Sequence, residues 1–171
     1  TDDNLRIMQV RAWLNGQDWY DLRQYRLDPP GGADIHWSLF VDLPLAAIIT
    51  ITKPFVGGAM AEKIAVATAP LLPMLVVLLS LGSAVRHLIG RMPFIEFAVA
   101  FLAMPITYAQ FSPLRIDHHG WQLACVALAV AGIANPKHVK GGAILGLATA
   151  LSLVIGIEML PYLIIAGAGT A

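Results

Sequence analysis

Long apolar segments with few charged residues dominate this chain from residue 43 onward. Four of them, 64–85, 93–111, 119–134 and 143–166, are close to the roughly 20 residues that an α-helix needs to cross the hydrocarbon core of a bilayer. Charged residues make up 13% of the chain, whereas about a quarter is usual in soluble domains. We therefore predict an all-α membrane protein in which residues 59–171 form a bundle of about four transmembrane helices.

The first 58 residues have a different composition, and we predict that they form a loop outside the bilayer. Residues 1–42 contain seven of the eleven acidic residues. Apolar positions between Leu5 and Leu14 predict a short amphipathic helix, with Arg6 and Gln9 away from its apolar face. Residues 39–55 are apolar but contain an aspartate, a lysine and two prolines, so we interpret them as helices that lie at the membrane interface or are only partly inserted.

Basic residues predict which helix ends face the cytoplasm. Two loops between the predicted spans are rich in Lys, Arg and His, and the positive-inside rule places both in the cytoplasm. These residues are Arg86, His87, Arg91, Lys137, His138 and Lys140. The loop 112–118 then faces the outer side, together with the N-terminal end, provided that 39–55 does not cross the membrane. If 39–55 does cross, the two lie on opposite faces.

Two acidic clusters would meet on that outer side. Asp2 and Asp3 are either capping and first-turn acids of the N-terminal helix or carboxylates that bind a divalent cation or accept a proton. Asp117, His118 and His119 lie where an apolar helix enters the membrane, and ionisable groups at such depth are usually functional. Oxygen and imidazole ligands together suit Mg²⁺, Mn²⁺ or Zn²⁺.

Other residues in the apolar part have structural interpretations. Glu158 should face the bundle interior, paired or protonated, or lie near the outer end of its helix. Gly142, Gly146 and Ala150 predict a close contact between helices. The single cysteine, Cys125, excludes an internal disulfide. A net charge of zero argues against nucleic-acid binding through a basic surface.

The two acidic clusters resemble those of GT-C-type membrane glycosyltransferases. The similarity is greatest to the catalytic subunits of oligosaccharyltransferases, and more distant to aminoarabinose and protein-mannosyl transferases. In that superfamily the first outer loop begins with an acid followed nine positions later by an arginine, as Asp2 and Arg11 are here. The archaeal oligosaccharyltransferases carry an Asp-His-His motif at the second outer loop, which residues 117–119 match. Where that motif continues to a glutamate, as Asp-His-His-x-x-Glu, this chain has Gln122. The stretch 25–36, with its Pro-Pro-Gly sequence, is similar to a proline-containing segment of the same first loop.

The resemblance implies a GT-C-like helix bundle with a long outer loop. It also implies a metal-assisted transfer of a sugar or glycan from a polyprenyl-phosphate-linked donor to an acceptor at the outer face of the membrane. Asp117 and His119 would bind the divalent metal (Mg²⁺, Mn²⁺ or Zn²⁺), with His118 as a further ligand, and Asp2 and Asp3 would be catalytic. The residues expected to bind substrate or phosphate are Arg6, Arg11, His36 and Arg115.

Two other interpretations fit the same apolar pattern. A transporter or flippase of lipid-linked glycans would share the helices and acids, and a non-catalytic subunit of a membrane assembly would tolerate changes at 117–119. The sequence begins without Met and stops soon after an apolar segment, so we expect a piece of a longer protein. We expect it in a bacterial inner membrane, with the site facing the periplasm.

Overall fold

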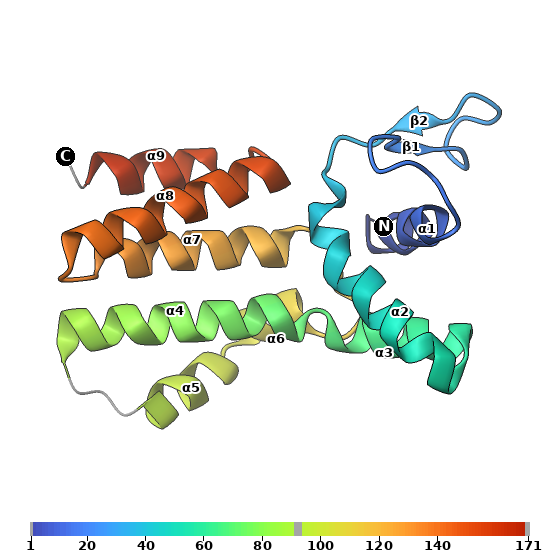
Figure 1. The fold of residues 1–171 in the computed structure, drawn as a ribbon. Helices are drawn as coiled ribbons and strands as arrows, with labels where there is room; N and C mark the ends of the chain where they lie inside the picture. The colour runs from blue at the N-terminus through green and yellow to red at the C-terminus, as the bar shows by residue number, and fades with distance from the viewer. Residues whose placement is uncertain (1, 91–93, 170–171) are drawn as a thin grey trace.

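The computed structural model describes residues 2–90 and 94–169 and is mostly helical (Figure 1). In chain order the elements are α1 (Asp2–Leu14), β1 (Arg23–Gln24), β2 (Ala33–Asp34), a 3-10 turn (Leu39–Asp42), α2 (Leu43–Val56), α3 (Gly58–Thr68), α4 (Leu71–Ile89), α5 (Phe94–Leu102), α6 (Pro105–Phe111), α7 (His119–Ile133), α8 (His138–Ile155) and α9 (Leu160–Ala168). Helices α4, α7, α8 and α9 form a bundle, and α1, α2 and the antiparallel pair β1–β2 lie beyond one end of it. The prediction of a helical protein is confirmed.

Within residues 2–90 and 94–169, three helical segments are long and apolar enough to cross a membrane: Leu39–Val56, Gly58–Ile89 and His138–Ile155. Helix α7 is also apolar but has only 15 residues. These segments indicate a membrane protein. Gly58–Ile89 contains the first predicted span, 64–85, and His138–Ile155 overlaps the fourth, 143–166, whereas Leu39–Val56 was not counted among the four. Residue 93, the predicted start of the second span, and Arg91 of the first basic loop lie outside the described residues.

The predicted span 93–111 is divided into two short helices. Helix α5 ends at Leu102 and α6 begins at Pro105, after Met104 has taken an extended conformation. The proline ring lacks the N–H group that would continue a helix, and it also disfavours helical geometry in the residue before it. The prediction of one continuous span here was wrong because it followed the hydropathy of the segment and gave too little weight to Pro105.

The predicted span 143–166 is also interrupted. Helix α8 ends at Ile155, the chain reverses, and α9 runs back along the bundle (Figure 1). At Gly156 there is no room for a side chain, because a Cβ atom would meet the carboxylate of Glu158 and the amide of Gln122. The reversal places Glu158 outside the helices, at the end of the bundle nearest α1, which is the second of the two positions that we predicted for it.

Helix α2 lies outside the bundle although its length and composition would allow it to cross a membrane. It runs away from the end of the bundle, and after Gly57 the chain returns as α3, which leads into α4 (Figure 1). Val10 of α1 packs with Leu45 and Ile49 of α2 and with Ala61 of α3 in one apolar core. Because this hairpin starts and finishes at the same end of the bundle, α1 meets the loop before α7 there.

Helix α1 has the predicted bounds, and Val10 of its predicted apolar face is buried, but the prediction that Arg6 and Gln9 lie away from the buried face was wrong. Its buried residues are Arg6, Gln9 and Val10. The two polar side chains are buried because other polar groups meet them: Asp42 accepts from Arg6, and the indole N–H of Trp37 donates to Gln9 at 2.9 Å. An apolar stripe in the sequence could not reveal these partners.

The contact between α7 and α8 depends on two glycines that face each other. A Cβ atom on Gly141 would lie 2.5 Å from the carbonyl oxygen of Gly132, so the helices approach too closely for any side chain there. Gly142 and Gly146, by contrast, are exposed, and a Cβ atom on either would meet nothing within 4 Å. The small residues predicted to form the contact therefore lie on the wrong face of α8.

We expect Gly141→Ala to destabilise the bundle by about 1–3 kcal/mol, the usual cost of overpacking a close contact. Gly142→Ala is the matched control on the same helix. It should be neutral or stabilising by up to about 1 kcal/mol, because alanine has the higher helix propensity and no clash arises. Thermal unfolding of both variants in detergent micelles, followed by circular dichroism, would reveal the difference. Equal melting temperatures would contradict the close contact.

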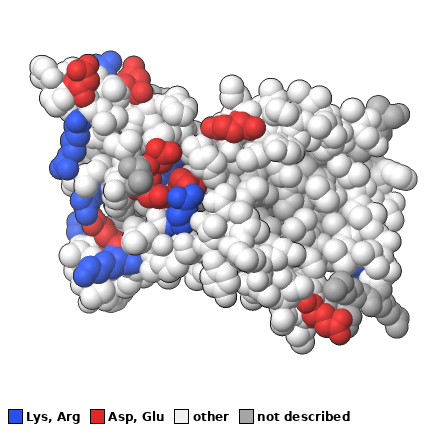
Figure 2. All heavy atoms as spheres, turned by 180° about the vertical axis from the view of Figure 1, so that it is seen from behind, with Lys and Arg blue, Asp and Glu red and all other residues white. Residues whose placement is uncertain are grey.

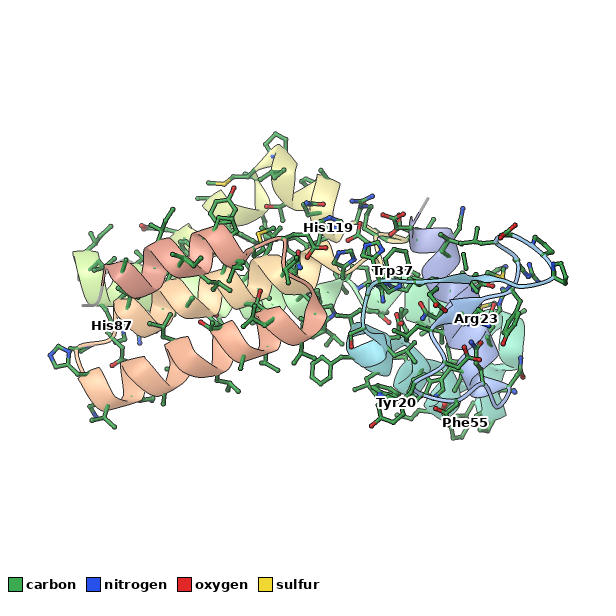
Figure 3. All side chains as sticks on the ribbon, turned by 90° about the horizontal axis from the view of Figure 1, so that it is seen from above. Tyr20, Arg23, Trp37, Phe55, His87 and His119 are labelled. Atoms are coloured by element: carbon green, nitrogen blue, oxygen red, sulfur yellow. The ribbon has the colours of Figure 1, made fainter. Side chains whose placement is uncertain are left out.

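The charged side chains of the bundle separate to its two ends. His87 lies at the end of α4 that is remote from Trp37 and His119 (Figure 3). Lys137 and His138 begin α8 at that same remote end (Figure 1). The other end, where α1 and the start of α7 meet, carries the acidic residues considered next.

Candidate functional site

Asp3 joins the N-terminal helix to the loop before α7. Its Oδ1 accepts hydrogen bonds from the backbone N–H groups of Ile116 and Asp117, at 3.0 and 3.1 Å. Its Oδ2 lies 3.5 Å from Nη1 of Arg115. These contacts span more than a hundred residues of sequence, and they confirm that the two acidic clusters meet at one end of the molecule.

Arg115 bridges the two clusters. Its Nη2 lies 2.9 Å from Oδ2 of Asp117, so one guanidinium group faces a carboxylate from each cluster. The side chain remains 39% exposed, whereas that of Asp117 is only 6% exposed. Acidic and basic side chains gather at the surface between the bundle and the N-terminal region (Figure 2). Arg115 is therefore the site arginine that a substrate can reach.

Asp117 also contacts His119. Its Oδ1 accepts a hydrogen bond from the backbone N–H of His119 at 3.1 Å and lies 3.4 Å from Nδ1 of the same residue. This Nδ1 atom is buried and makes no hydrogen bond within the described chain. Asp117 and His119 thus form a donor pair of which one member has a free ring nitrogen.

A second network lies behind this pair and is centred on Arg6. Arg6 and Asp42 are both fully buried and form an ion pair of 2.8 Å. Nη2 of Arg6 lies 3.4 Å from Nδ1 of His118, and its guanidinium lies 5.1 Å from the ring centre of Trp37. Because Arg6 is buried and has these three partners, it supports the site and is not accessible to a substrate.

His118 links that network to Glu158. Arg6 can only donate, so Nδ1 of His118 must accept and the proton must lie on Nε2. Nε2 then donates to Oε1 of Glu158 at 3.0 Å. Desolvation is the main cause that lowers the pKa of His118, and the charges of Arg6 and His119 lower it further. Both ring nitrogens of His118 are engaged, so it does not face a shared ion with Asp117 and His119.

Glu158 is held as an anion at the reversal after α8. Partial burial by itself would raise the pKa of its carboxyl group. Hydrogen bonds from Gln122, from its own backbone N–H and from His118 outweigh this effect and lower the pKa to about 2. Gln122 is fully buried, and its amide group donates to Oε2 of Glu158. This Gln122 occupies the position at which the resemblance leads one to expect a glutamate.

The donor atoms of Asp117 and His119 suit a divalent metal in charge and spacing, but they supply only two ligands. Two ligands that are each about 2.1 Å from one ion lie roughly 3–3.4 Å apart, and Nδ1 of His119 and Oδ1 of Asp117 are 3.4 Å apart. The network has four carboxylates for two guanidinium groups, so negative charge is in excess. Among the described residues, however, no group of three His, Cys, Asp or Glu side chains is arranged to hold a metal. Oxygens of substrate and water would have to complete the coordination.

Three of the predicted site residues lie apart from this network. Asp2 is exposed at the start of α1. Arg11 forms an ion pair with Glu62 of α3, with Nε at 2.7 Å from Oε1. His36 is exposed and lies edge-on to Trp37, with 5.1 Å between the ring centres. Only Arg115 of the four predicted substrate-binding residues is both in the network and accessible.

Three residues of the network were not among the predicted site residues: Asp42, Gln122 and Glu158. Glu158 could have been identified as an isolated acid among apolar residues, for which a buried partner is expected. Gln122 lies one helical turn after His118 and His119, on the same face of α7. The sequence around Asp42 gives no comparable indication of a role in the site, because only the fold brings Asp42 to Arg6.

The backbone is strained at Leu114, immediately before Arg115. Leu114 has a φ of 75°, in the left-handed region, and its N–H donates to the carbonyl of Val66 at 2.9 Å. This conformation costs most residues about 1–2 kcal/mol. Here it turns the chain so that Arg115 faces Asp3.

We expect Leu114→Gly to be more stable than Leu114→Ala by about 1 kcal/mol. Glycine adopts the left-handed conformation without a steric penalty, whereas alanine retains the Cβ atom that causes it. The side chain of Leu114 is 64% exposed, so both variants lose little packing. Thermal unfolding of the two proteins tests this expectation, and an alanine variant that is equally or more stable would contradict it.

No family model, no curated protein and no solved structure matches this chain.

Proposed function

We propose that this chain carries the outward-facing site of a GT-C-like membrane glycosyltransferase. The reaction would transfer a sugar or glycan from a polyprenyl-phosphate-linked donor to an acceptor. The observation that supports it best is that Asp3, Arg115, Asp117 and His119 gather at one end of a bundle whose helices α4 and α8 are apolar enough to cross a membrane. An amphiphilic donor needs such a position, with its lipid in the bilayer and its phosphate beside polar groups.

Arg115 is the proposed phosphate ligand. A guanidinium group donates parallel hydrogen bonds to phosphate oxygens, and that of Arg115 is accessible while Asp3 and Asp117 fix its position. A divalent metal bound by Asp117 and His119 would supply a Lewis acid that neutralises the phosphate leaving group. This chain's own residues would hold the phosphate end at the mouth of α7.

The two N-terminal acids have different proposed roles. Asp3 already accepts two backbone hydrogen bonds and faces Arg115, so it is a positioning residue. Asp2 is exposed, and its carboxylate is available to accept a proton from the acceptor nucleophile. In this assignment the site faces the periplasm of a bacterial inner membrane, since the basic residues of the two short loops, Arg86 with His87 and Lys137 with His138, lie at the opposite end of the bundle.

The test is sugar release or transfer by the purified full-length protein, supplied with a fluorescent polyprenyl-phosphate-linked sugar and an acceptor extract, with and without chelator. We expect turnover that chelation abolishes and Mn²⁺ or Mg²⁺ restores. Asp2→Asn should lower kcat and leave the melting temperature unchanged, whereas Asp3→Asn should lower both. Absence of turnover in every condition would contradict the proposal.

The interruption between α5 and α6 favours a second candidate, a transporter of lipid-linked glycans, because transporters bind their substrates at broken helices. The structure has this break at Pro105 and a reversal after Ile155. The same donor reconstituted in vesicles separates the two functions. Movement of intact donor across the bilayer, with no release of sugar, would favour the transporter.

A further inference from the structure

A pocket of about 530 Å³ lies beside two residues that contact His118, namely Trp37 and Glu158. It is formed by the loop after α1 and by the end of α8 with the reversal that follows it. The lining side chains that matter here are Trp19, Tyr20, His36, Trp37, Ser38 and Glu158. Mixed apolar and polar walls of this kind are typical of small-molecule sites.

The charge of the lining excludes a phosphate. Of the described residues that line the pocket, none is Lys or Arg, and the one residue with a full charge is Glu158. This carboxylate accepts hydrogen bonds from His118, from Gln122 and from its own backbone N–H, and the side chain is still 38% exposed. A carboxylate oxygen accepts more than one hydrogen bond. Glu158 can therefore accept hydrogen bonds from a ligand that carries hydroxyl groups.

Trp37 offers no free ring face to a cation. An ammonium group binds over ring faces, but Trp37 is 95% buried and its ring is already in contact with the guanidinium of Arg6 and with His118, at 5.1 and 5.9 Å between centres. Tyr20, in contrast, is 88% exposed, so its ring is open to a ligand. The pocket thus offers the exposed ring of Tyr20, the partly exposed ring of Trp19, hydroxyl and imidazole groups, and a carboxylate acceptor.

We propose that this pocket binds a pyranose ring, with sugar hydroxyls donating to Glu158 and the C–H face of the sugar lying against Tyr20. The inference rests on the proposed transferase function, because it assigns the sugar of the donor to this pocket and its phosphate to Arg115. The two places are linked through neighbouring rings, since Glu158 of the pocket contacts His118 and the ring centres of His118 and His119 are 4.4 Å apart. One substrate could reach both.

The experiment is saturation-transfer difference NMR on the full-length protein in lipid nanodiscs, with the methyl glycosides of glucose, galactose, mannose and N-acetylglucosamine as probes. Tyr20→Ala should weaken binding of the preferred glycoside by about 3- to 10-fold, the size of one aromatic contact. Glu158→Gln should weaken it to a similar degree. The matched control is Tyr25→Ala, which removes an exposed tyrosine of the same loop that does not line the pocket.

Weakening in Tyr20→Ala but not in Tyr25→Ala would support the sugar pocket. Absence of binding by any glycoside, equal binding by both tyrosine variants, or displacement by tetramethylammonium would overturn it. The transfer assay distinguishes this failure from that of the proposed function. Turnover without Tyr20-dependent binding rejects only the pocket, and Tyr20-dependent binding without turnover rejects only the transferase.

Discussion

Replacing Asp117 by asparagine is expected to lower the rate of sugar transfer by about 100-fold or more while the protein stays folded. The substitution keeps the shape of the side chain but removes the charge that faces Arg115 at 2.9 Å and His119 at 3.4 Å. Arg115 would lose one of the two carboxylates that fix it, and a metal would lose one of its two protein ligands. In the proposed reaction, both losses would act where the negative charge of the phosphate leaving group develops.

The measurement is the initial rate with the polyprenyl-linked donor, together with a melting curve. Asp34→Asn is the matched control, because it makes the same chemical change in a surface ion pair with Arg23 at 3.3 Å, and it should leave the rate unchanged. Titration with Mn²⁺ distinguishes the two causes. If Asp117 binds the metal, Asp117→Asn should need a higher Mn²⁺ concentration for its half-maximal rate. Arg115→Lys should need the same Mn²⁺ concentration as the wild type. A rate within about threefold of the wild type would show that Asp117 does not take part in catalysis.

The meeting of the two acidic clusters could be predicted from the sequence because it follows from the order of helices. Antiparallel helices bring the loop before α7 and the N-terminal region to one end once α2 and α3 form a hairpin outside the bundle. The partner of Asp3 could not be predicted. Its hydrogen bonds to Ile116 and Asp117 depend on the left-handed turn at Leu114, which no glycine marks in the sequence.

The polar side chains of the network were harder to assign than the apolar core. Arg6 and Arg11 look alike in the sequence, five positions apart on one helix, and both were predicted to bind substrate. The structure buries Arg6 completely against Asp42 and leaves Arg11 44% exposed beside Glu62. Hydrophobic periodicity indicates where apolar side chains go. It does not indicate which arginine will form an ion pair with a buried carboxylate.

That difference leads to the second large expected effect, on stability. We expect Arg6→Met to lower the free energy of unfolding by about 3–5 kcal/mol, the usual cost of leaving one member of a buried ion pair without its partner. Asp42 would remain fully buried with neither oxygen bonded, because its Oδ2 has no hydrogen-bond partner in the described chain even with Arg6 present. His118 would also lose the donor that faces its Nδ1.

Arg11→Met is the matched control on the same helix. It removes an arginine from an ion pair that solvent reaches, so it should cost no more than about 1 kcal/mol. The double variant Arg6→Met/Asp42→Leu should recover most of the lost stability, because an apolar pair can replace a buried ion pair at little cost. Unfolding in mixed micelles, followed by tryptophan fluorescence, is measured for the wild type and these three variants. The single variant Asp42→Leu is measured as well, because it completes the double-mutant cycle for Arg6 and Asp42. If Arg6→Met costs no more than Arg11→Met, or if the double variant is the least stable, then the ion pair does not hold α1 to the start of α2. The site would then need another explanation for its rigidity.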